Sequence, residues 1–427
     1  MNHLGLPRVA AASIAALLAG CGDNHTSFLE GLALDGRAPD VLAPGPGALP
    51  GTPGVELRAT GSLRNIHLSW AGRSDATDYL VYRATGDAPF VRLTDSPIEA
   101  TSYDDPIASP GGDGVEYRYI IAAARDVESE RSNVATAMHG TRLAEAYLES
   151  FATVPERSPY VADASTTLAG DLWVSPDTKL YVRGGAVLDF EAGGVFLVAG
   201  LLRAIGSASA PAIFTAHQRA GGYLPDGEGF YFAFSGVSYN PDDRSGSVLD
   251  HVHVRNLAET AVFGGNRRTS LAVTGSGIAL DNVKVVVNGN GSLLVREGGW
   301  VVLRHSHFDG LGLVVDTDVR ATPFAVTDNA FRGGLSAIAF RYVASPPVRS
   351  GQIDSNDLDG SLQSAELIHV SGTANIPLGN NYWGQGLFSS KDVPFVYNDN
   401  DASTVTFDFD DPSPTLHLPP AGAGPDW

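Results

Sequence analysis

Asp316, Asp318 and Arg320 stand at alternate positions of one segment, and Asp309 lies a few residues upstream. Alternate residues of a β-strand point to the same side of a sheet, so this spacing would gather two carboxylates and a guanidinium on one face. Paired carboxylates can hold a calcium ion or flank a glycosidic bond during hydrolysis. These three residues are the candidate catalytic set, with ordinary exposed charges as the alternative.

Four histidines form two His-x-His pairs, His251 with His253 and His305 with His307. On a strand, each pair would present two imidazole nitrogens on one side, as in part of a transition-metal site. Such a site needs a further ligand, and the sequence places none. We therefore favour positions fixed by repeat stacking, with metal ligation as the alternative.

Asp399 and Asp401 form an acidic group near the C-terminus. Carboxylates in such a loop can bind calcium, but the glycine and the distal glutamate of an EF-hand loop are missing. We expect a solvated acidic loop and no bound cofactor. Calcium at Asp399 and Asp401 is the alternative.

Most of these candidates belong to a repeat. Six segments each begin and end with an apolar residue, and their first residues are separated by 31, 23, 23, 27 and 25 positions. A period in this range indicates a stack of similar units, and short strands with Asn, Asp and Gly at the corners predict a parallel β-helix. The segments are residues 249–254 (LDHVHV), 280–285 (LDNVKV), 303–308 (LRHSHF), 326–331 (VTDNAF), 353–358 (IDSNDL) and 378–383 (LGNNYW).

Three of the segments carry asparagine at the same position, as Asn329, Asn356 and Asn381. Asparagine at a repeated corner can hydrogen-bond to its equivalent in the next coil, and it tolerates a left-handed backbone. We predict that these three residues are structural rather than catalytic.

The composition agrees with a β-rich chain that contains many tight corners. The 427 residues include 49 glycines, only 18% are charged, and the net charge is −20. Binding to phosphate groups depends on Lys and Arg, so this balance argues against a nucleic-acid partner. The chain also lacks a phosphate-binding glycine loop and a Gly-x-Ser-x-Gly turn, which leaves nucleotide and serine-hydrolase chemistry without support.

Residues 1–21 have the features of an export signal. Arg8 precedes an apolar run at residues 9–18 that is too short for a stable membrane anchor. The run ends in Leu-Ala-Gly-Cys, which resembles the lipobox of bacterial lipoproteins, and Cys21 is the only cysteine. The resemblance implies that Cys21 is lipidated and anchors the chain to a membrane. Because glycine rather than aspartate follows the cysteine, the resemblance favours the outer membrane.

Residues 22–53 and residues 54–138 differ in composition. The first stretch is rich in Pro, Gly and Ala, which predicts a flexible linker. In the second, period-2 runs between Gly, Asp and Pro clusters predict an antiparallel β-sandwich. Its order and spacing resemble a fibronectin type III domain, which implies a spacer or a weak contact module. The matching segments are residues 66–70 (IHLSW), 78–83 (DYLVYR), 101–105 (TSYDD), 115–123 (VEYRYIIAA) and 132–136 (SNVAT).

Residues 139–162 contain the best helical periodicity of the chain. Leu143, Tyr147 and Phe151 recur at helical spacing, and Pro155 ends the run. We expect a connecting helix that caps the first coil of the stack, since an open end would expose core and backbone groups.

Residues 163–384 resemble right-handed parallel β-helix proteins of the pectate lyase-like superfamily. The matching segments are residues 185–190 (GAVLDF), 200–206 (GLLRAIG), 211–215 (PAIFT) and, as a last coil, 380–384 (NNYWG). Residues 385–427 leave the repeat as a C-terminal extension, in which residues 393–396 and 405–407 are candidate edge strands.

This superfamily includes lyases, hydrolases, epimerases, adhesins and scaffolds, so the resemblance predicts the fold and not the activity. In its calcium-dependent lyases, a basic residue removes the proton α to a uronate carboxylate, and Lys284 and Arg320 are the convenient candidates here. The local catalytic signatures of its lyases and hydrolases are absent from the sequence.

We therefore predict a non-enzymatic, surface-anchored structural or recognition lipoprotein that contacts glycans or a surface protein through its β-helix. A polysaccharide lyase or glycoside hydrolase is the alternative, and a scaffold without a ligand is the third. Catalysis predicts that Asp316, Asp318 and Arg320 face outward into a groove. Recognition predicts a row of exposed aromatic residues.

Overall fold

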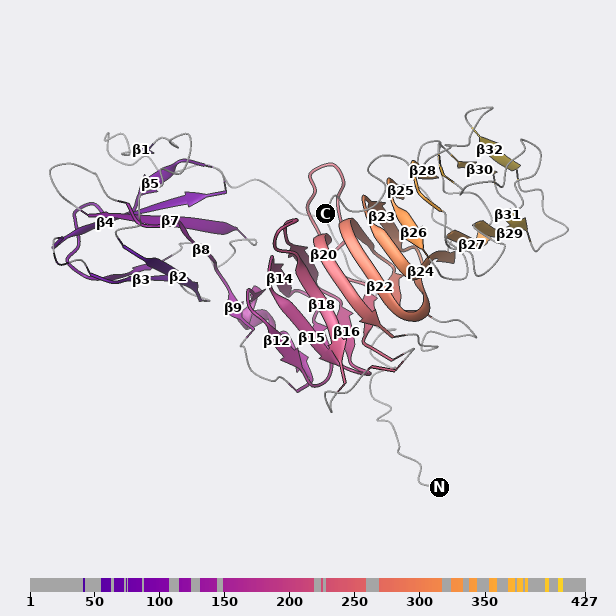
Figure 1. The fold of residues 1–427 in the computed structure, drawn as a ribbon, viewed down its shortest axis with the longest axis horizontal. Helices are drawn as coiled ribbons and strands as arrows, with labels where there is room; N and C mark the ends of the chain where they lie inside the picture. Colours follow the sequence, from indigo (N-terminus) through magenta and orange to yellow (C-terminus); the bar gives the residue numbers. More distant parts are fainter. Residues whose placement is uncertain are drawn as a thin grey trace, which may run out of the picture. The chain divides into compact units, whose positions relative to one another are not determined.

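The computed structural model shows an all-β chain: an antiparallel sandwich followed by a right-handed parallel β-helix (Figure 1). The one helical element among the described residues is the short 3-10 turn η1 (Pro155–Arg157). No helix in this described part is long and apolar enough to cross a membrane. The structure describes residues 41–42, 55–62, 65–72, 74, 76–86, 88–106, 115–123, 131–143, 149–218, 224–225, 228–258, 269–316, 324–332, 338–343, 353–358, 368–372, 375–378, 381–382, 396–398 and 406–409.

The sandwich consists of a five-stranded sheet with the order β1-β5-β4-β7-β8 and a three-stranded sheet with the order β2-β3-β6. Apolar and polar residues alternate in its strands, so one side of each sheet enters the core. Trp70 illustrates this: it is buried, and its ring packs edge-on against Tyr79, with the ring centroids 5.4 Å apart. The strands are β1 (Val41–Leu42), β2 (Leu57–Gly61), β3 (Ile66–Trp70), β4 (Tyr79–Thr85), β5 (Phe90–Arg92), β6 (Ser102–Asp105), β7 (Glu116–Ala123) and β8 (Ala135–Met138).

Part of the predicted linker belongs to this sandwich. β1 pairs antiparallel with β5, with Val41 opposite Val91 and Leu42 opposite Phe90. The linker prediction for residues 22–53 is therefore wrong at these two positions. Two successive β-formers suffice to extend an exposed sheet edge there.

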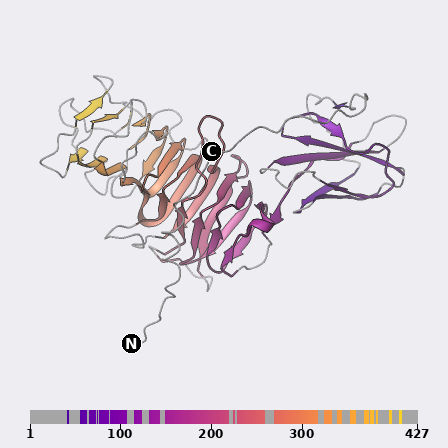
Figure 2. The same cartoon turned by 180° about the vertical axis from the view of Figure 1, so that it is seen from behind.

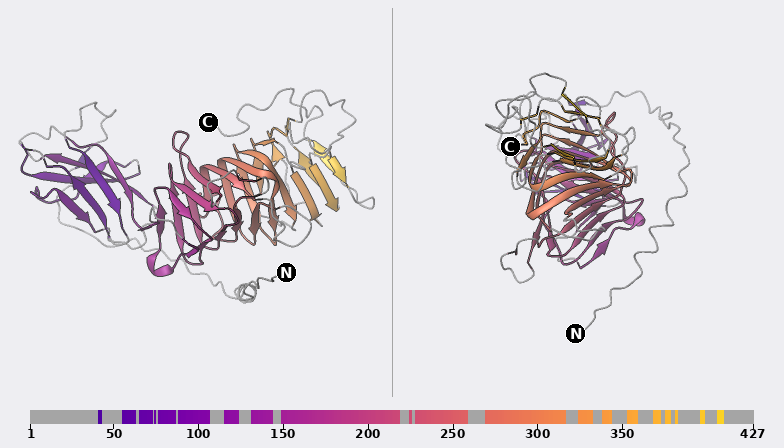
Figure 3. Two further views of the ribbon diagram at one scale, coloured as in Figure 1. Left: turned by 60° about the horizontal axis from the view of Figure 1, so that its bottom comes forward. Right: turned by 90° about the vertical axis from the view of Figure 1, so that its right-hand side faces the viewer.

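The β-helix is built from three parallel sheets that the chain visits in turn, once per coil. The left view of Figure 3 and the reverse view in Figure 2 show its strands side by side. The first sheet contains β11 (Tyr160–Ala162), β14 (Lys179–Arg183), β17 (Leu201–Ile205), the starts of β20 (Val248–Leu257) and β22 (Gly277–Arg296), β23 (Trp300–Arg304), β25 (Ala325–Thr327) and β28 (Ile353–Asp354).

The second and third sheets follow the same order. The second contains β12 (Thr166–Leu168), β15 (Val187–Glu191), β18 (Ala212–His217), the later part of β20, the middle of β22, the start of β24 (His307–Asp316) and β26 (Ala330–Arg332). The third contains β10 (Phe151–Ala152), β13 (Leu172–Val174), β16 (Val195–Val198), β19 (Tyr231–Phe234), β21 (Leu271–Thr274), the ends of β22 and β24, β27 (Ile338–Val343), β29 (Ile368–Gly372) and β31 (Val396–Asn398).

The stack begins earlier than predicted, and its first segment is not the expected helix. Between residues 139 and 162, the described residues form β9 (Thr141–Arg142), β10, η1 and β11. β9 pairs in parallel with β11, and β10 pairs in parallel with β13. The apolar residues that suggested a helix instead supply the first coil, where Leu143 joins the core and Phe151 packs against it. Tertiary packing overrides local periodicity in this segment.

The C-terminal extension continues the parallel pairing. β31 pairs with β29, and β32 (Thr406–Phe409) pairs with β30 (Asn375–Leu378). The prediction that the extension adds strands is confirmed, although the boundary at residue 384 is too early.

The six repeat segments lie in register, as predicted. Leu249, Leu280, Leu303, Val326 and Ile353 are successive partners in adjacent coils, and every one of them has 0% exposure. Two isolated bridges extend the register to the last segment, where Asp357 pairs with Ala330 and Tyr382. A slip of one residue would turn this apolar column outward, so the buried core fixes the register.

A ladder of buried side chains crosses the coils at the fourth position of the repeat. Asn329 donates from its backbone N–H and from Nδ2 to Oδ1 of Asn356, both at 3.0 Å, and Asn356 makes the same pair of bonds to Asn381 at 3.0 and 2.9 Å. Ser306 extends the ladder by one coil, because its backbone N–H donates a hydrogen bond to Oδ1 of Asn329 at 3.1 Å. The structural role predicted for these asparagines is confirmed. The left-handed backbone falls on the residues just before them, with φ of 58° at Asp328 and 56° at Ser355.

We expect Asn356→Ala to lower the free energy of unfolding by at least about 2 kcal/mol. The change leaves the buried N–H of Asn329 and the carbonyl of Val326 without their partner, and each orphaned group costs about 1–3 kcal/mol. Urea-induced unfolding measures the loss. Asn240→Ala, at an exposed turn, is the matched control and should shift the midpoint little. Equal shifts in both variants would contradict a stabilising ladder.

Candidate functional site on the second sheet

Most residues predicted to be functional lie outside the described part of the chain. Asp318, Arg320, Asp399, Asp401 and Cys21 all fall there. Asp316 ends β24 in register with Arg296 of β22, and the structure does not describe its side chain. Catalysis at Asp316, Asp318 and Arg320, calcium at Asp399 and Asp401, and lipidation of Cys21 therefore stay predictions.

The two His-x-His pairs do not form metal-binding pairs. His251 and His305 have left-handed backbones at the corner between the first and second sheets, with φ of 51° and 46°, whereas His253 and His307 lie on second-sheet strands. The expectation that each pair follows one regular strand is therefore wrong, because the corner separates its members. The described residues also contain no group of three or more His, Cys, Asp or Glu able to hold a metal ion.

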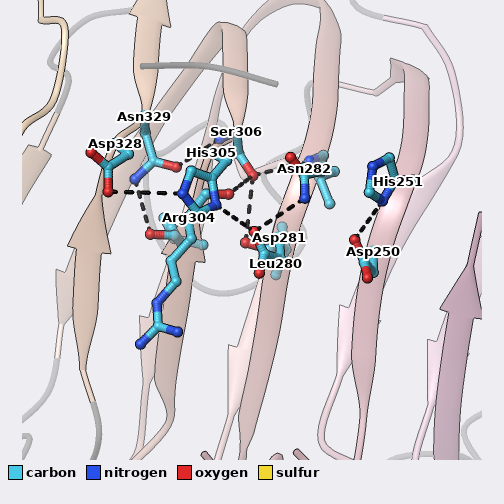
Figure 4. Close-up of polar contacts among 12 residues, drawn as sticks. Asp250, His251, Leu280, Asp281, Asn282, Arg304, His305, Ser306, Asp328 and Asn329 are labelled. Carbon is cyan, nitrogen blue, oxygen red and sulfur yellow. Dashed lines mark hydrogen bonds and ion pairs between the residues drawn. The ribbon is translucent and has the colours of Figure 1, made fainter. Parts of the chain in front are cut away.

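The corner itself carries a row of acidic residues and histidines (Figure 4). His305 lies between two carboxylates of adjacent coils, with Nδ1 at 2.8 Å from Oδ1 of Asp281 and Nε2 at 4.0 Å from Oδ2 of Asp328. One coil further back, Nδ1 of His251 lies 2.7 Å from Oδ1 of its neighbour Asp250. An imidazole held between two carboxylates links three coils electrostatically when it is protonated.

Asp328 is the strained member of this row. Burial raises its pKa above the usual value, and Asp354 of the next coil raises it further, while His305 acts in the opposite direction. The carboxylate is therefore less well accommodated in the folded chain than in water.

The outward side of the second sheet carries most of the exposed charge of these coils. The inward neighbours, such as Val252, Val254, Val283 and Val285, are fully buried, so the residues between them face outward. We call the resulting set the polar strip. It consists of His253, Arg255, Lys284, His307, Asp309, Arg332 and Asp357.

Three residues of the polar strip form a column across adjacent coils. His253 is the register partner of Lys284, and Lys284 is the register partner of His307. Adjacent strands lie about 4.8 Å apart, so an exposed ammonium group has an imidazole on each side. This His253–Lys284–His307 set is called the central column below.

His253 is a neutral imidazole that accepts a hydrogen bond. Its Nδ1 lies 2.6 Å from Nη2 of Arg255. A guanidinium can only donate, so Nδ1 accepts and the ring proton is on Nε2. Burial lowers the pKa of His253 to about 4, and the positive charges of Arg255 and Lys284 add to this effect.

His307 is neutral for related reasons. Burial lowers its pKa, and Arg332 and Lys284 lower it further, which outweighs the opposite influence of Asp309 and Asp357. Arg332 is itself engaged in an ion pair with the buried carboxylate of Asp357. At neutral pH the central column therefore carries the positive charge of Lys284 between two uncharged rings.

Earlier coils of the second sheet add a carboxylate paired with a histidine. Asp189 of β15 lies in register with Thr215 of β18, and its Oδ1 is 3.0 Å from Nδ1 of His217. The outward side of the second sheet therefore changes from acidic residues in β15 to mainly basic ones in β20, β22 and β26.

The outward sides of the other two sheets each contain an apolar, buried column. In the third sheet, Ala233, Ala272, Leu294 and Val314 are successive partners, and each is less than 10% exposed. The first sheet has an equivalent buried column of Val248, Ala279 and Val302. The first sheet also has a charged outward column, in which Asp250, Asp281 and Arg304 are successive, partly exposed partners.

A row of exposed aromatic residues is not found in the described part of the chain. Trp173, on the third sheet, is 45% exposed and is the one aromatic residue there among the exposed large apolar side chains.

The comparisons with known proteins concern the fold. Two solved structures are similar to this chain: pectate lyase Pel3 from Pectobacterium carotovorum at 13% identity and pectate lyase PelI from Erwinia chrysanthemi, in complex with tetragalacturonic acid, at 12%. The first match covers 82% of this chain and 91% of the other, the second covers 83% and 99%, and the TM-score is 0.17 in both. No family model and no curated protein matches the sequence.

The sequence interpretation missed the central column, although the signal was present. The fifth position of the aligned repeat segments reads His253, Lys284, His307, Ala330, Asp357 and Tyr382. The residue type at this position changes from one coil to the next. The change is visible when the segments are compared with one another, and it is not visible in the His-x-His spacing along the chain.

We expect Asp328→Asn to stabilise the protein at pH 7 by a small amount, under about 1 kcal/mol at this partly exposed site. The folded chain raises the pKa of Asp328, so the charged form opposes folding above that pKa, and asparagine removes the charge while tolerating the left-handed backbone. The gain should disappear as pH falls towards 4, where Asp328 takes up a proton.

Unfolding midpoints in urea between pH 4 and pH 8 test this expectation. Asp177→Asn is the matched control, because Asp177 is exposed and also left-handed, with φ of 60°. A gain that persists at pH 4, or that also appears in the control, would contradict the electrostatic cause.

Proposed function

We propose that this protein recognises an acidic polysaccharide through the polar strip of its β-helix, without turning it over. In this proposal the lipid on Cys21 anchors the chain at the bacterial outer membrane. The sandwich serves as a fibronectin type III-like spacer that carries the β-helix away from that surface.

The observation that carries the proposal is that the three cations of the strip outnumber its two carboxylates, Asp309 and Asp357, in a chain whose net charge is −20. Arg255 and Lys284 are exposed, and Arg332, the register partner of Asp309, is half-buried. Clustered like charges create a local positive potential against the overall negative field. Anionic groups would be attracted to this face and repelled elsewhere.

The geometry of the strip supports a polymeric ligand. The groups recur at the coil spacing of about 4.8 Å, so a chain that runs along the stack would meet a new donor at each coil. The neutral imidazole of His307 adds a hydrogen-bonding group beside the ammonium of Lys284, as sugar hydroxyls require.

A polysaccharide lyase is the second candidate, and one observation favours it. Lys284 stands on a rigid strand between two neutral imidazoles, each of which can accept a proton. Proton removal beside a uronate carboxylate needs such a base. In this candidate the central column would act together with the predicted set Asp316, Asp318 and Arg320.

We expect Lys284→Gln to weaken the binding of polygalacturonate at least about tenfold, since a charge-assisted contact contributes about 1.5–3 kcal/mol. Binding is measured by calorimetry at low ionic strength, with and without calcium, and should weaken with added salt. Lys179→Gln is the matched control, because Lys179 lies on the first sheet.

The same samples are assayed for ultraviolet absorbance of unsaturated sugar ends and for new reducing ends. Binding without products supports recognition. Products that disappear in Lys284→Gln would replace recognition by a lyase or hydrolase, and binding that Lys284→Gln leaves intact would remove the polar strip as the site.

A further inference from the structure

Resting on the proposed function, we infer that the central column makes polyanion binding dependent on pH, with the affinity rising in mild acid. His253 and His307 take up protons as an anionic chain settles over Lys284. The column thereby changes from one positive charge to as many as three. The ligand class is a polymer with carboxylate or sulfate groups at intervals near the coil spacing.

The register of the sheet makes this coupling direct. Both histidines are the immediate neighbours of Lys284 on adjacent strands, so an anion held by the ammonium group also lies within the field of both rings. A negative charge near an imidazole favours its protonated form. Protonation of either ring in turn strengthens its attraction to the anion, because linkage is reciprocal.

At His253 a proton would change the contacts as well as the charge. Nδ1 accepts the hydrogen bond from Arg255 at 2.6 Å, and a protonated Nδ1 can only donate. The guanidinium and the imidazolium would then repel each other, so Arg255 would move out towards solvent. The anionic chain would gain one cationic group, the imidazolium, and would meet Arg255 in a more exposed position.

At His307 the surrounding charges are balanced differently. Lys284 and Arg332 oppose protonation, and Asp309 and Asp357 favour it. Asp357 is already paired with Arg332, which leaves the exposed carboxylate of Asp309 as a local counter-charge. Burial also opposes protonation of His307. A ligand that neutralises Lys284 and Arg332 removes the two charge repulsions that act in the same direction, so the pKa of His307 would rise on binding.

The direction of the pH dependence follows from the unliganded state. Burial and nearby cations hold the pKa of His253 at about 4 and lower that of His307, so both rings are neutral at pH 7 and His253 is mostly neutral even at pH 5. If the ligand returns His253 to its ordinary value of 6.5, the affinity rises on the order of tenfold between pH 7 and pH 5. A matching change at His307 steepens the rise.

The test uses dextran sulfate, whose charge is constant over this range, and uncharged dextran as the blank. Calorimetry of the purified protein from pH 7.5 to pH 5 should show affinity for dextran sulfate rising about tenfold or more. The double variant His253→Asn and His307→Asn should lose this rise. His67→Asn, in the sandwich, is the matched histidine control and should keep it.

Proton uptake gives a second readout that needs no variant. Binding heats at pH 6, measured in two buffers of different ionisation enthalpy, should reveal net uptake of protons by the wild-type protein. Uptake near zero would overturn the inference even if the double variant failed to fold.

The outcomes separate the inference from the proposed function. Binding at pH 7 that does not strengthen towards pH 5, or that strengthens equally in the double variant, overturns the pH coupling and leaves polyanion recognition standing. Absence of binding to dextran sulfate and to polygalacturonate at every pH overturns both.

Discussion

The buried ladder at the corner between the first and second sheets is the constraint on which the later coils depend. Each asparagine satisfies backbone groups of its own coil and of the next, as Asn356 does for Val326 and Asn329. A polar side chain with 0% exposure is tolerated only when its donors and acceptors are paired. The ladder therefore forbids a shift of one coil against the next, and it fixes which residues face the core.

Because the register is fixed, the outward positions fall into two groups. In one group packing determines the residue type, and in the other it does not. On the first and third sheets, the outward columns that contain Ala279 and Ala272 are apolar and buried, so their composition follows from burial, as that of the core does. On the second sheet, one outward position is occupied in successive coils by His253, Lys284 and His307, which differ in size and charge. Neither burial nor backbone geometry requires these types, which is why we place function there.

The β-helix could be predicted from the sequence because the same hexapeptide pattern recurs in successive coils. Leu280, Leu303 and Val326 align in the sequence and stack in the structure for the same reason, namely that every coil must fill one shared core. Sandwich strands such as β3 and β8 could also be predicted from the sequence, since they bury alternate residues. Repetition and alternation are signals that tertiary contacts do not override.

The failures came from segments in which local pattern and tertiary role diverge. Leu143 and Phe151 have helical spacing, yet they serve two different strands of the first coil. His305 and His307 alternate like residues of one strand, yet a left-handed residue makes the first of them a corner. Such corners depend on contacts between coils, as between His305 and Asp281. The residue pattern of a single segment therefore does not predict them.

The central column also has an electrostatic rationale in the unliganded protein. Three permanent cations at about 4.8 Å would repel one another by roughly 1 kcal/mol per adjacent pair in water and by several kcal/mol at the lower effective dielectric of a protein surface. Histidines at the two outer positions avoid this cost, because burial and Lys284 keep them neutral. Lysine or arginine there would destabilise the stack whether or not a ligand were present. Imidazoles carry the charge only when an anion offsets it, so the same side chains suit both the folded coil and an acidic polymer.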